Sequence, residues 1–208
     1  SAEVLFSTGD AVSIYSYFAD RLNAQMVYRK MSDWEPGVPI AEDIRGDRIT
    51  LSALGSLPNS SRNRSFDAEG APIRDRFLIK DGVMQGFWGN RQFSQYLGLE
   101  ESSGMNNARV TGGSASPEEL RQGDFLEVVE FSDFQVDQMA GNIAGEIRLA
   151  YWHHGGEVTV VTGGSVTGSL PEALPTLRCS EAETQYDRYV IPAVTRLAGL
   201  NITGGAEM

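Results

Sequence analysis

Glycine interrupts the apolar stretches of this chain at short intervals, and this feature constrains the fold more than any other. The chain of 208 residues contains 23 glycines, and most of them stand where a hydrophobic alternation stops. Glycines in such places are typical of turns between short strands. We therefore predict an α+β fold in which antiparallel sheet predominates and helices are few and short. No repeat, low-complexity tract or linker divides the sequence, so residues 1–208 are expected to form a single domain.

The composition and charge exclude several classes of protein. With 41% hydrophobic and 22% charged residues, the chain has the composition of an ordinary soluble globular protein. No segment approaches the roughly 20 apolar residues that span a bilayer, which argues against a membrane protein. The net charge of -11 should repel phosphate backbones, which argues against direct nucleic-acid binding. The single cysteine, Cys179, excludes an internal disulfide and fits the reducing cytoplasm.

Several local patterns predict individual elements. Apolar residues at helical spacing predict an amphipathic helix over residues 11–22. Asp81-Gly82 joins two apolar stretches within residues 77–88, and both residue types tolerate the positive φ of a type I′ hairpin turn. Ser116 and Glu119 have the spacing of a capping box at the start of a very short helix. Asn90 is expected to cap another short helix.

The remaining apolar runs predict strands. Residues 36–65 are rich in Pro, Gly, Asp, Ser and Arg and should form loops around one short strand. The final stretch alternates well enough for one or two strands. The expected strands cover residues 26–31, 49–54, 125–131, 145–153, 157–162 and 189–202.

Candidate metal ligands are scarce. His153 and His154 are adjacent, and adjacent strand residues point to opposite faces, so only a turn could bring them together. Cys179 is expected near the end of a helix that a proline breaks, beside Glu181 and Glu183, whose charges would raise the pKa of its thiol. A structural zinc site needs four converging ligands and a catalytic one needs three. The residues therefore predict no metal site and no complete catalytic set in this chain.

An ordered series of short motifs resembles the C-terminal half of the TldD/TldE family, also called PmbA or modulator of DNA gyrase. No single motif is specific, and the resemblance depends on their order and spacing over nearly the whole chain. The motifs are residues 26–30 (MVYRK), 66–70 (FDAEG), 79–83 (IKDGV), 93–98 (FSQYLG), 106–109 (NNAR), 141–145 (GNIAG), 156–161 (GEVTVV) and 165–170 (SVTGSL).

The resemblance implies a cytoplasmic, two-component metallopeptidase that processes small or unfolded peptides. In the family, the TldD-type subunit binds zinc through a motif in its N-terminal half, His-Glu followed after three residues by His, and that half has no counterpart here. The family's cysteine ligand comes from a different context, so its role is not carried over to Cys179. The chain therefore resembles the noncatalytic TldE/PmbA type, with no cofactor of its own and with zinc expected in a TldD-like partner subunit of an oligomer.

A subunit without metal could enclose the catalytic chamber or hold an extended peptide at a strand edge. The candidate residues for contact with a peptide or partner are the polar groups at glycine-rich turns, Asn106, Asn107, Arg109 and Asn142, together with Trp152. In the alternative interpretation, the asparagines only stabilise turns and Trp152 only packs in the core.

Two other functions remain open. The chain could be a free-standing domain that binds a peptide or partner without hydrolysis. It could also be a fragment of a catalytic TldD-type metallopeptidase.

Overall fold

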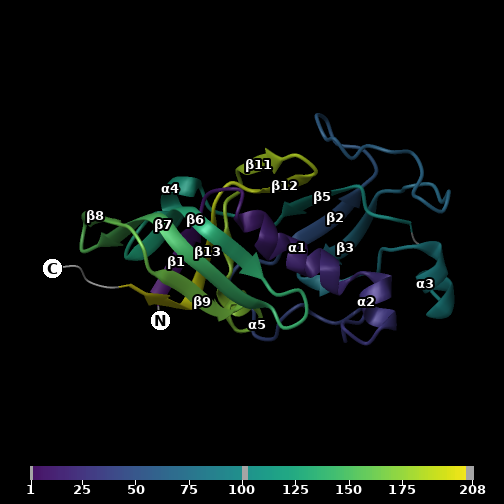
Figure 1. Cartoon of the computed structure of the whole chain (residues 1–208), viewed down its shortest axis with the longest axis horizontal. Helices are drawn as coiled ribbons and strands as arrows, with labels where there is room; N and C mark the ends of the chain where they lie inside the picture. Colours follow the sequence, from purple (N-terminus) through teal and green to yellow (C-terminus); the bar gives the residue numbers. More distant parts are fainter. Residues whose placement is uncertain (1, 100–102, 205–208) are drawn as a thin grey trace.

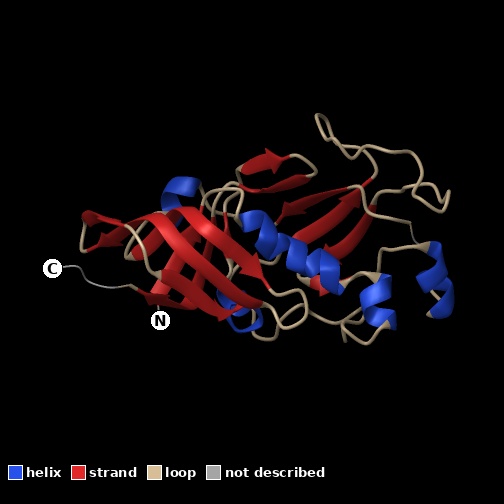
Figure 2. Cartoon of the chain, viewed as in Figure 1, coloured by secondary structure: helices blue, strands red, loops and turns tan. Residues whose placement is uncertain are grey.

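The computed structural model describes residues 2–99 and 103–204, which form two β-sheets with a helix where the sheets meet (Figure 1). Many more residues lie in strands than in helices, as Figure 2 shows. The predicted α+β class, with mainly antiparallel sheet and a few short helices, is confirmed. Within the described ranges no helix has both the length and the apolar character needed to cross a bilayer.

Five strands of the first sheet close into a small barrel. β1 pairs with β6 in parallel and with β13 in antiparallel orientation. Antiparallel pairs of β6 with β7, β7 with β9, and β9 with β13 complete the ring. β8 extends the sheet at β7, and β10 extends it at β13. The bounds are β1 (Ala2–Phe6), β6 (Phe125–Val136), β7 (Asn142–His154), β8 (Glu157–Val161), β9 (Ser165–Ser169), β10 (Arg178–Cys179) and β13 (Thr195–Thr203).

The second sheet has the order β11-β12-β5-β2-β3-β4. All its neighbours are antiparallel except β12 and β5, which run in parallel. The bounds are β2 (Thr50–Leu54), β3 (Arg76–Lys80), β4 (Val83–Met84), β5 (Asn107–Thr111), β11 (Glu183–Tyr186) and β12 (Tyr189–Pro192).

Helix α1 (Ala11–Arg21) joins the two sheets. It contacts β6 of the barrel and β12 of the second sheet, and its residues Ile14, Tyr15 and Phe18 are fully buried. Burial of each such side chain stabilises the fold by about 1.5–3 kcal/mol. One continuous hydrophobic core therefore runs from the barrel through α1 to the second sheet. The other helices are α2 (Ala24–Tyr28), α3 (Arg91–Tyr96), α4 (Pro117–Leu120), α5 (Leu170–Ala173) and the 3-10 helix η1 (Leu174–Thr176).

Most of the predicted elements are confirmed. The helix at residues 11–22, the short strand near residue 50 and the final strands are present, while β6 and β7 extend beyond their predicted ends. Asp81 and Gly82 have φ values of 51° and 74°, as a type I′ turn requires. The capping box forms, because Glu119 N–H donates to Ser116 Oγ at 3.1 Å. Asn90 takes the N-cap position of α3, although its side chain makes no capping hydrogen bond.

Two predictions were wrong. Residues 26–31 form no strand, because Asn23 caps a helix by accepting a hydrogen bond from Gln25 N–H at 2.8 Å, and Tyr28 then packs on the rings of α3. Cys179 lies in a strand just beyond the proline-containing helix and not in the helix itself. The chain leaves η1 at Leu177 in an extended conformation, and Cys179 follows in β10.

Candidate functional site

The residues proposed from the sequence lie in different sheets. Asn106 immediately precedes β5, while Asn107 and Arg109 belong to this strand of the second sheet. Asn142 and Trp152 belong to β7 of the barrel. The first three therefore lie in or just before β5, and the other two lie on β7.

The two neighbouring asparagines hold the loop that follows β2. Asn106 donates from Nδ2 to the carbonyl oxygen of Arg64 at 2.8 Å, and Asn107 donates to Asn63 Oδ1 at 3.0 Å. Asn107 also accepts a hydrogen bond from Ser60 Oγ. Both side chains are buried, so their polar atoms are used within the protein.

The other three candidates have mixed environments. Arg109 is half exposed and makes a bidentate ion pair with Glu183 of β11, with Nη2 to Oε2 at 2.7 Å. This hydrogen bond and the charge of Glu183 raise the pKa of Arg109. Trp152 packs against the hydrophobic core. Asn142 is exposed, and its backbone carbonyl accepts a hydrogen bond from Asp137 N–H at 2.8 Å, which closes the β6–β7 turn.

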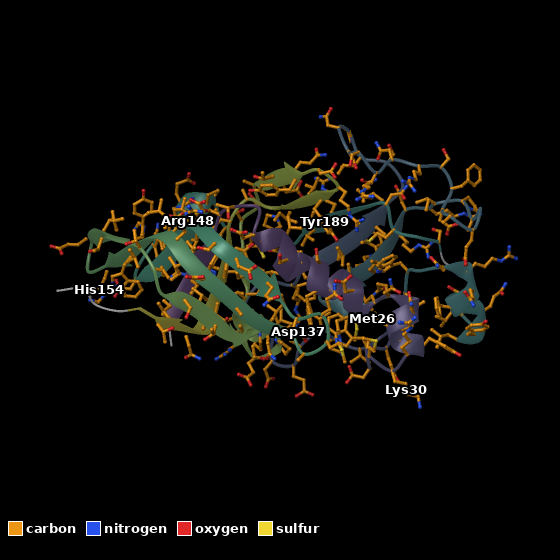
Figure 3. All side chains as sticks on the ribbon, viewed as in Figure 1. Met26, Lys30, Asp137, Arg148, His154 and Tyr189 are labelled. Carbon is orange, nitrogen blue, oxygen red and sulfur yellow. The ribbon has the colours of Figure 1, made fainter. Side chains whose placement is uncertain are left out.

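The two histidines point to opposite faces of β7. His153 stacks on Phe125, with ring centroids 4.3 Å apart. His154 lies at the end of the β7–β8 hairpin (Figure 3), where its Nδ1 is 2.8 Å from Asp124 Oδ2. Gly155 N–H also donates to Asp124, and this bond, together with His154, lowers the pKa of the Asp124 carboxyl. The histidines are thus held apart, as their adjacency in a strand predicts.

Cys179 is fully buried and has no solvent contact. Its Sγ lies 3.3 Å from Tyr15 Oη, which in turn lies 2.8 Å from Thr195 Oγ1. Burial raises the pKa of the Cys179 thiol to about 12, and the charge of Asp47 adds to this effect. The direction of the shift agrees with the sequence prediction, but its cause does not, because neither neighbouring glutamate contributes. A protonated thiol is a poor metal ligand and a poor nucleophile.

The described ranges, 2–99 and 103–204, hold no group of three or more His, Cys, Asp or Glu side chains that could bind a metal ion. Of the donors that a zinc site prefers, Cys179 and His154 are hydrogen-bonded within the fold, and His153 lies on the face of β7 opposite to His154, so the three do not converge. These residues therefore do not fit a zinc site.

Strand β8 presents an open edge. Within the described residues it pairs only with β7, and Val158 and Val160 are 58% and 61% exposed. Gly155 and Gly156 form a two-residue turn, so the closing pair of His154 and Glu157 is expected to be hydrogen-bonded. The alternation of an antiparallel ladder then directs the backbone N–H and C=O groups of Val158 and Val160 to the open side.

A cavity of about 890 Å³ lies beside β10. Its charged lining consists of three arginines, Arg45, Arg178 and Arg196, and two glutamates, Glu3 and Glu119. Arg178 and Arg196 stand directly opposite each other in the β10–β13 pair. Like charges directly opposite in a ladder are destabilising, so this pair requires compensation by negative charge.

Arg196 has its compensation within the protein. It is mostly buried, pairs with Glu3, and donates from Nη1 to the carbonyl oxygens of Leu120 and Gln122, each at 2.7 Å. Its guanidinium also lies 5.0 Å from the ring centroid of Phe125. Arg196 is therefore a fixed wall of the cavity, whereas Arg178 is exposed to it.

Asp47 and two glycines hold the backbone segments next to the cavity together. Asp47 accepts hydrogen bonds from Cys179 N–H at 2.7 Å and from Ser114 Oγ at 3.1 Å. A Cβ on Gly46 would lie 2.0 Å from the carbonyl oxygen of Leu177, and one on Gly113 would lie 2.3 Å from that of Ser180. Only glycine permits this close backbone approach, which brings the loops before β2 and after β5 against β10.

The sequence reasoning missed this cavity. Its charged residues come from separate segments, around positions 3, 45, 119, 178 and 196, and no local motif connects them. The sequence offers glycines near two arginines, Gly46 after Arg45 and Gly112-Gly113 after Arg109. These glycines indicate close backbone packing but not a cavity.

Comparison with known proteins gives a consistent result. Residues 1–204 match the family model described as PmbA/TldA metallopeptidase C-terminal domain. "Metalloprotease PmbA" of Escherichia coli O157:H7 is 24% identical over 177 residues, and "Metalloprotease TldD homolog" of Haemophilus influenzae is 23% identical over 166 residues. The aligned regions cover 82% and 71% of this chain, respectively, but 39% and 34% of those proteins.

Solved structures show the same fold. TldE from Thermococcus kodakarensis superposes with a TM-score of 0.79 at 19% sequence identity, covering 98% of this chain and 50% of that one. A putative modulator of a DNA gyrase from Thermotoga maritima gives a TM-score of 0.80 at 17% identity, covering 97% and 49%. The chain thus spans about half the length of the solved relatives and less of the curated ones.

Proposed function

The chain belongs to the PmbA/TldA metallopeptidase family and corresponds to its C-terminal domain. From this premise we propose that it is a noncatalytic, TldE/PmbA-like part of a two-component zinc peptidase. The proposal rests on the residues that could bind zinc. Cys179 is a buried thiol with a pKa of about 12, and His153 and His154 are held on opposite faces of β7. Zinc and the activated water then belong to a TldD-like partner subunit, which acts with this chain in the cytoplasm.

The part that this chain plays is to hold peptides. The open edge of β8 offers the outward backbone groups of Val158 and Val160 to an extended peptide, which would add as a further strand. Main-chain hydrogen bonds select an extended conformation and depend little on sequence. Small or unfolded peptides can adopt that conformation, whereas the strands of a folded protein are already paired.

The same edge also favours a second candidate, a free-standing domain that binds a peptide or partner without hydrolysis. The two functions differ in whether a zinc-bearing partner associates with the chain. They share the prediction that peptide binding depends on the β8 edge.

A digestion experiment distinguishes them. Unstructured peptides are incubated with this chain, with a TldD-like subunit, and with both together, and the products are identified by mass spectrometry. We expect cleavage only where the TldD-like subunit is present, and more of it with both components. Cleavage by this chain alone would refute the noncatalytic role, while peptide binding without any effect on the partner would favour the free-standing domain.

A matched pair of variants tests the edge itself. Val160→Pro removes an outward N–H and leaves the ladder to β7 intact, because proline is tolerated at a strand edge. Val160→Ala keeps the N–H and removes most of the side chain. We expect Val160→Pro to weaken peptide binding more than Val160→Ala, with unchanged far-UV circular dichroism for both. Equal affinities for the two variants would refute strand addition at β8.

A further inference from the structure

The charged lining of the cavity beside β10, three arginines and two glutamates, has a net positive charge in a protein whose net charge is -11. Arg196 is neutralised by Glu3, and Glu119 is engaged as the capping-box residue that accepts a hydrogen bond from Ser116 N–H at 2.6 Å. This bond is the main reason why the pKa of Glu119 is lowered. The charge of Arg178 also lowers the pKa of Glu119. The side chains of Arg45 and Arg178 make no hydrogen bond or ion pair within residues 2–99 and 103–204.

The register of the sheet points to an anion at this place. Arg178 lies directly opposite Arg196, and the two side chains line the same cavity. Two like charges in that position favour a negative group between or beside them. Arg45 reaches the cavity from a different loop, which the bonds from its own N–H and that of Gly46 to the carbonyl oxygen of Pro175 fix against η1, at 2.9 and 3.0 Å.

We propose that this cavity binds the C-terminal carboxylate of a short peptide, with Arg178 and Arg45 as the donors; the choice of a peptide as ligand rests on the proposed function. Arginine matches a carboxylate through two parallel N–H donors. Three arginines and two glutamates give the lining a net charge of +1, and the Asp47 carboxylate lies next to it on Ser114, so the site suits a monoanion better than a dianion such as phosphate. The volume of about 890 Å³ is within the range for small-ligand sites and has room for the terminal residues of a peptide.

The test compares two forms of one probe. A fluorescein-labelled, alanine-rich heptapeptide is prepared with a free C-terminal carboxylate and as its C-terminal amide, and binding to the full chain is measured by fluorescence anisotropy. We expect the acid to bind about tenfold more tightly than the amide, as one charge-assisted contact at a partly exposed site provides. The preference should shrink as the salt concentration rises.

Three charge-matched variants locate the effect. Arg178→Gln and Arg45→Gln should reduce the preference for the acid severalfold or abolish it, because each removes a cavity donor. Arg148→Gln is the control, since Arg148 lies on β7 (Figure 3), is well exposed and is 3.8 Å from Glu130. It should keep the full preference although it changes the net charge equally. Unchanged unfolding midpoints verify that each variant is folded.

Each result decides the proposal. Equal affinity for acid and amide would overturn the carboxylate site while leaving peptide binding, and hence the proposed function, intact. Binding of neither form would overturn both. A preference lost equally in Arg148→Gln would show a general charge effect and overturn the site. Displacement of the acid by an equal concentration of inorganic phosphate would identify a phosphate site and also overturn it.

Discussion

Asp47 connects three segments that meet at the cavity. Its carboxylate accepts hydrogen bonds from the backbone N–H of Cys179 at 2.7 Å and from Ser114 Oγ at 3.1 Å, and its own N–H donates to the carbonyl oxygen of Leu177 at 2.7 Å. The side-chain bonds join the loop before β2 to β10 and to the segment after β5. Replacement of Asp47 by Ala removes both side-chain bonds and leaves the backbone bond in place.

The size of the effect follows from these contacts. A hydrogen bond from a buried backbone N–H to a charged acceptor contributes about 1.5–3 kcal/mol, and a hydroxyl bond contributes about 1 kcal/mol. Asp47→Ala should therefore lower the free energy of unfolding by about 3 kcal/mol. Asp47→Asn keeps an oxygen for the Cys179 N–H and loses mainly the charge, so it should lose about 1 kcal/mol. For a domain of this size, 3 kcal/mol corresponds to a decrease of about 6–12 °C in Tm.

The assay is denaturant unfolding followed by circular dichroism, supported by thermal melts. Glu157→Gln is the control for loss of a charge, because Glu157 is exposed on β8 and makes no side-chain bond within the described ranges. It should leave the midpoint almost unchanged. If Asp47→Ala and Asp47→Asn have the same midpoint, the two side-chain bonds do not hold β10 and the reasoning fails.

Three further predictions follow from the turn, the thiol and the histidines. The free energy of unfolding should be about 1–2 kcal/mol lower for Gly82→Val than for Gly82→Asn, because both add a Cβ 3.3 Å from Ile44 Cδ1 but only valine is poorly suited to a φ of 74°. Equal midpoints of denaturant unfolding would exclude the type I′ turn. Since burial raises the pKa of Cys179 from its usual 9 to about 12, its contribution to stability is complete below about pH 9 and is lost as the pH rises toward 12, at about 1.4 kcal/mol per pH unit. Cys179→Ser should flatten this alkaline decline, and an unchanged slope would refute the shift. Elemental analysis of the purified chain should show no stoichiometric zinc, whereas one zinc per chain that is lost in His153→Ala or His154→Ala would contradict the noncatalytic assignment.

The elements that the sequence predicted correctly are those that local chemistry determines. Asp81-Gly82 specifies its turn through the φ values that these residues tolerate, and the capping box of Ser116 and Glu119 needs only residues within one helical turn. The fold class followed for the same reason, because turn residues at short intervals limit the length of every element between them.

The parts that were missed depend on contacts between distant segments. The Asn23 cap starts the helix Ala24–Tyr28, and the packing of Tyr28 on Phe93 and Tyr96, far along the sequence, favours this helix over a strand. Cys179 is buried because Tyr15, which is 164 positions away in the sequence, lies over it. The roles of Asn106 and Asn107 within a loop network became visible only when the loop was placed beside β5.

The way in which the chain protects its other strand edges supports β8 as the edge proposed to bind peptides. Barrel closure pairs β1 with both β6 and β13, and segment 37–40 covers β4, where Met84 N–H donates to the carbonyl oxygen of Val38 at 3.0 Å.

Strand β11 is guarded differently from β8. Its Glu183 is paired with Arg109, and its Gln185 donates to the carbonyl oxygen of Pro58 at 2.7 Å, so polar side chains of this edge are already bound to neighbouring segments. β8 instead exposes Val158 and Val160 and has one charged residue, at its first position. Charged and covered edges resist the addition of a strand, whereas an apolar, open one accepts it. Arg109, predicted as a peptide contact, therefore has a second role to be tested, which is to guard β11. If Arg109→Gln frees β11, peptide binding should rise in that variant and persist when Val160→Pro is added to it. Without such a rise, β8 remains the proposed edge.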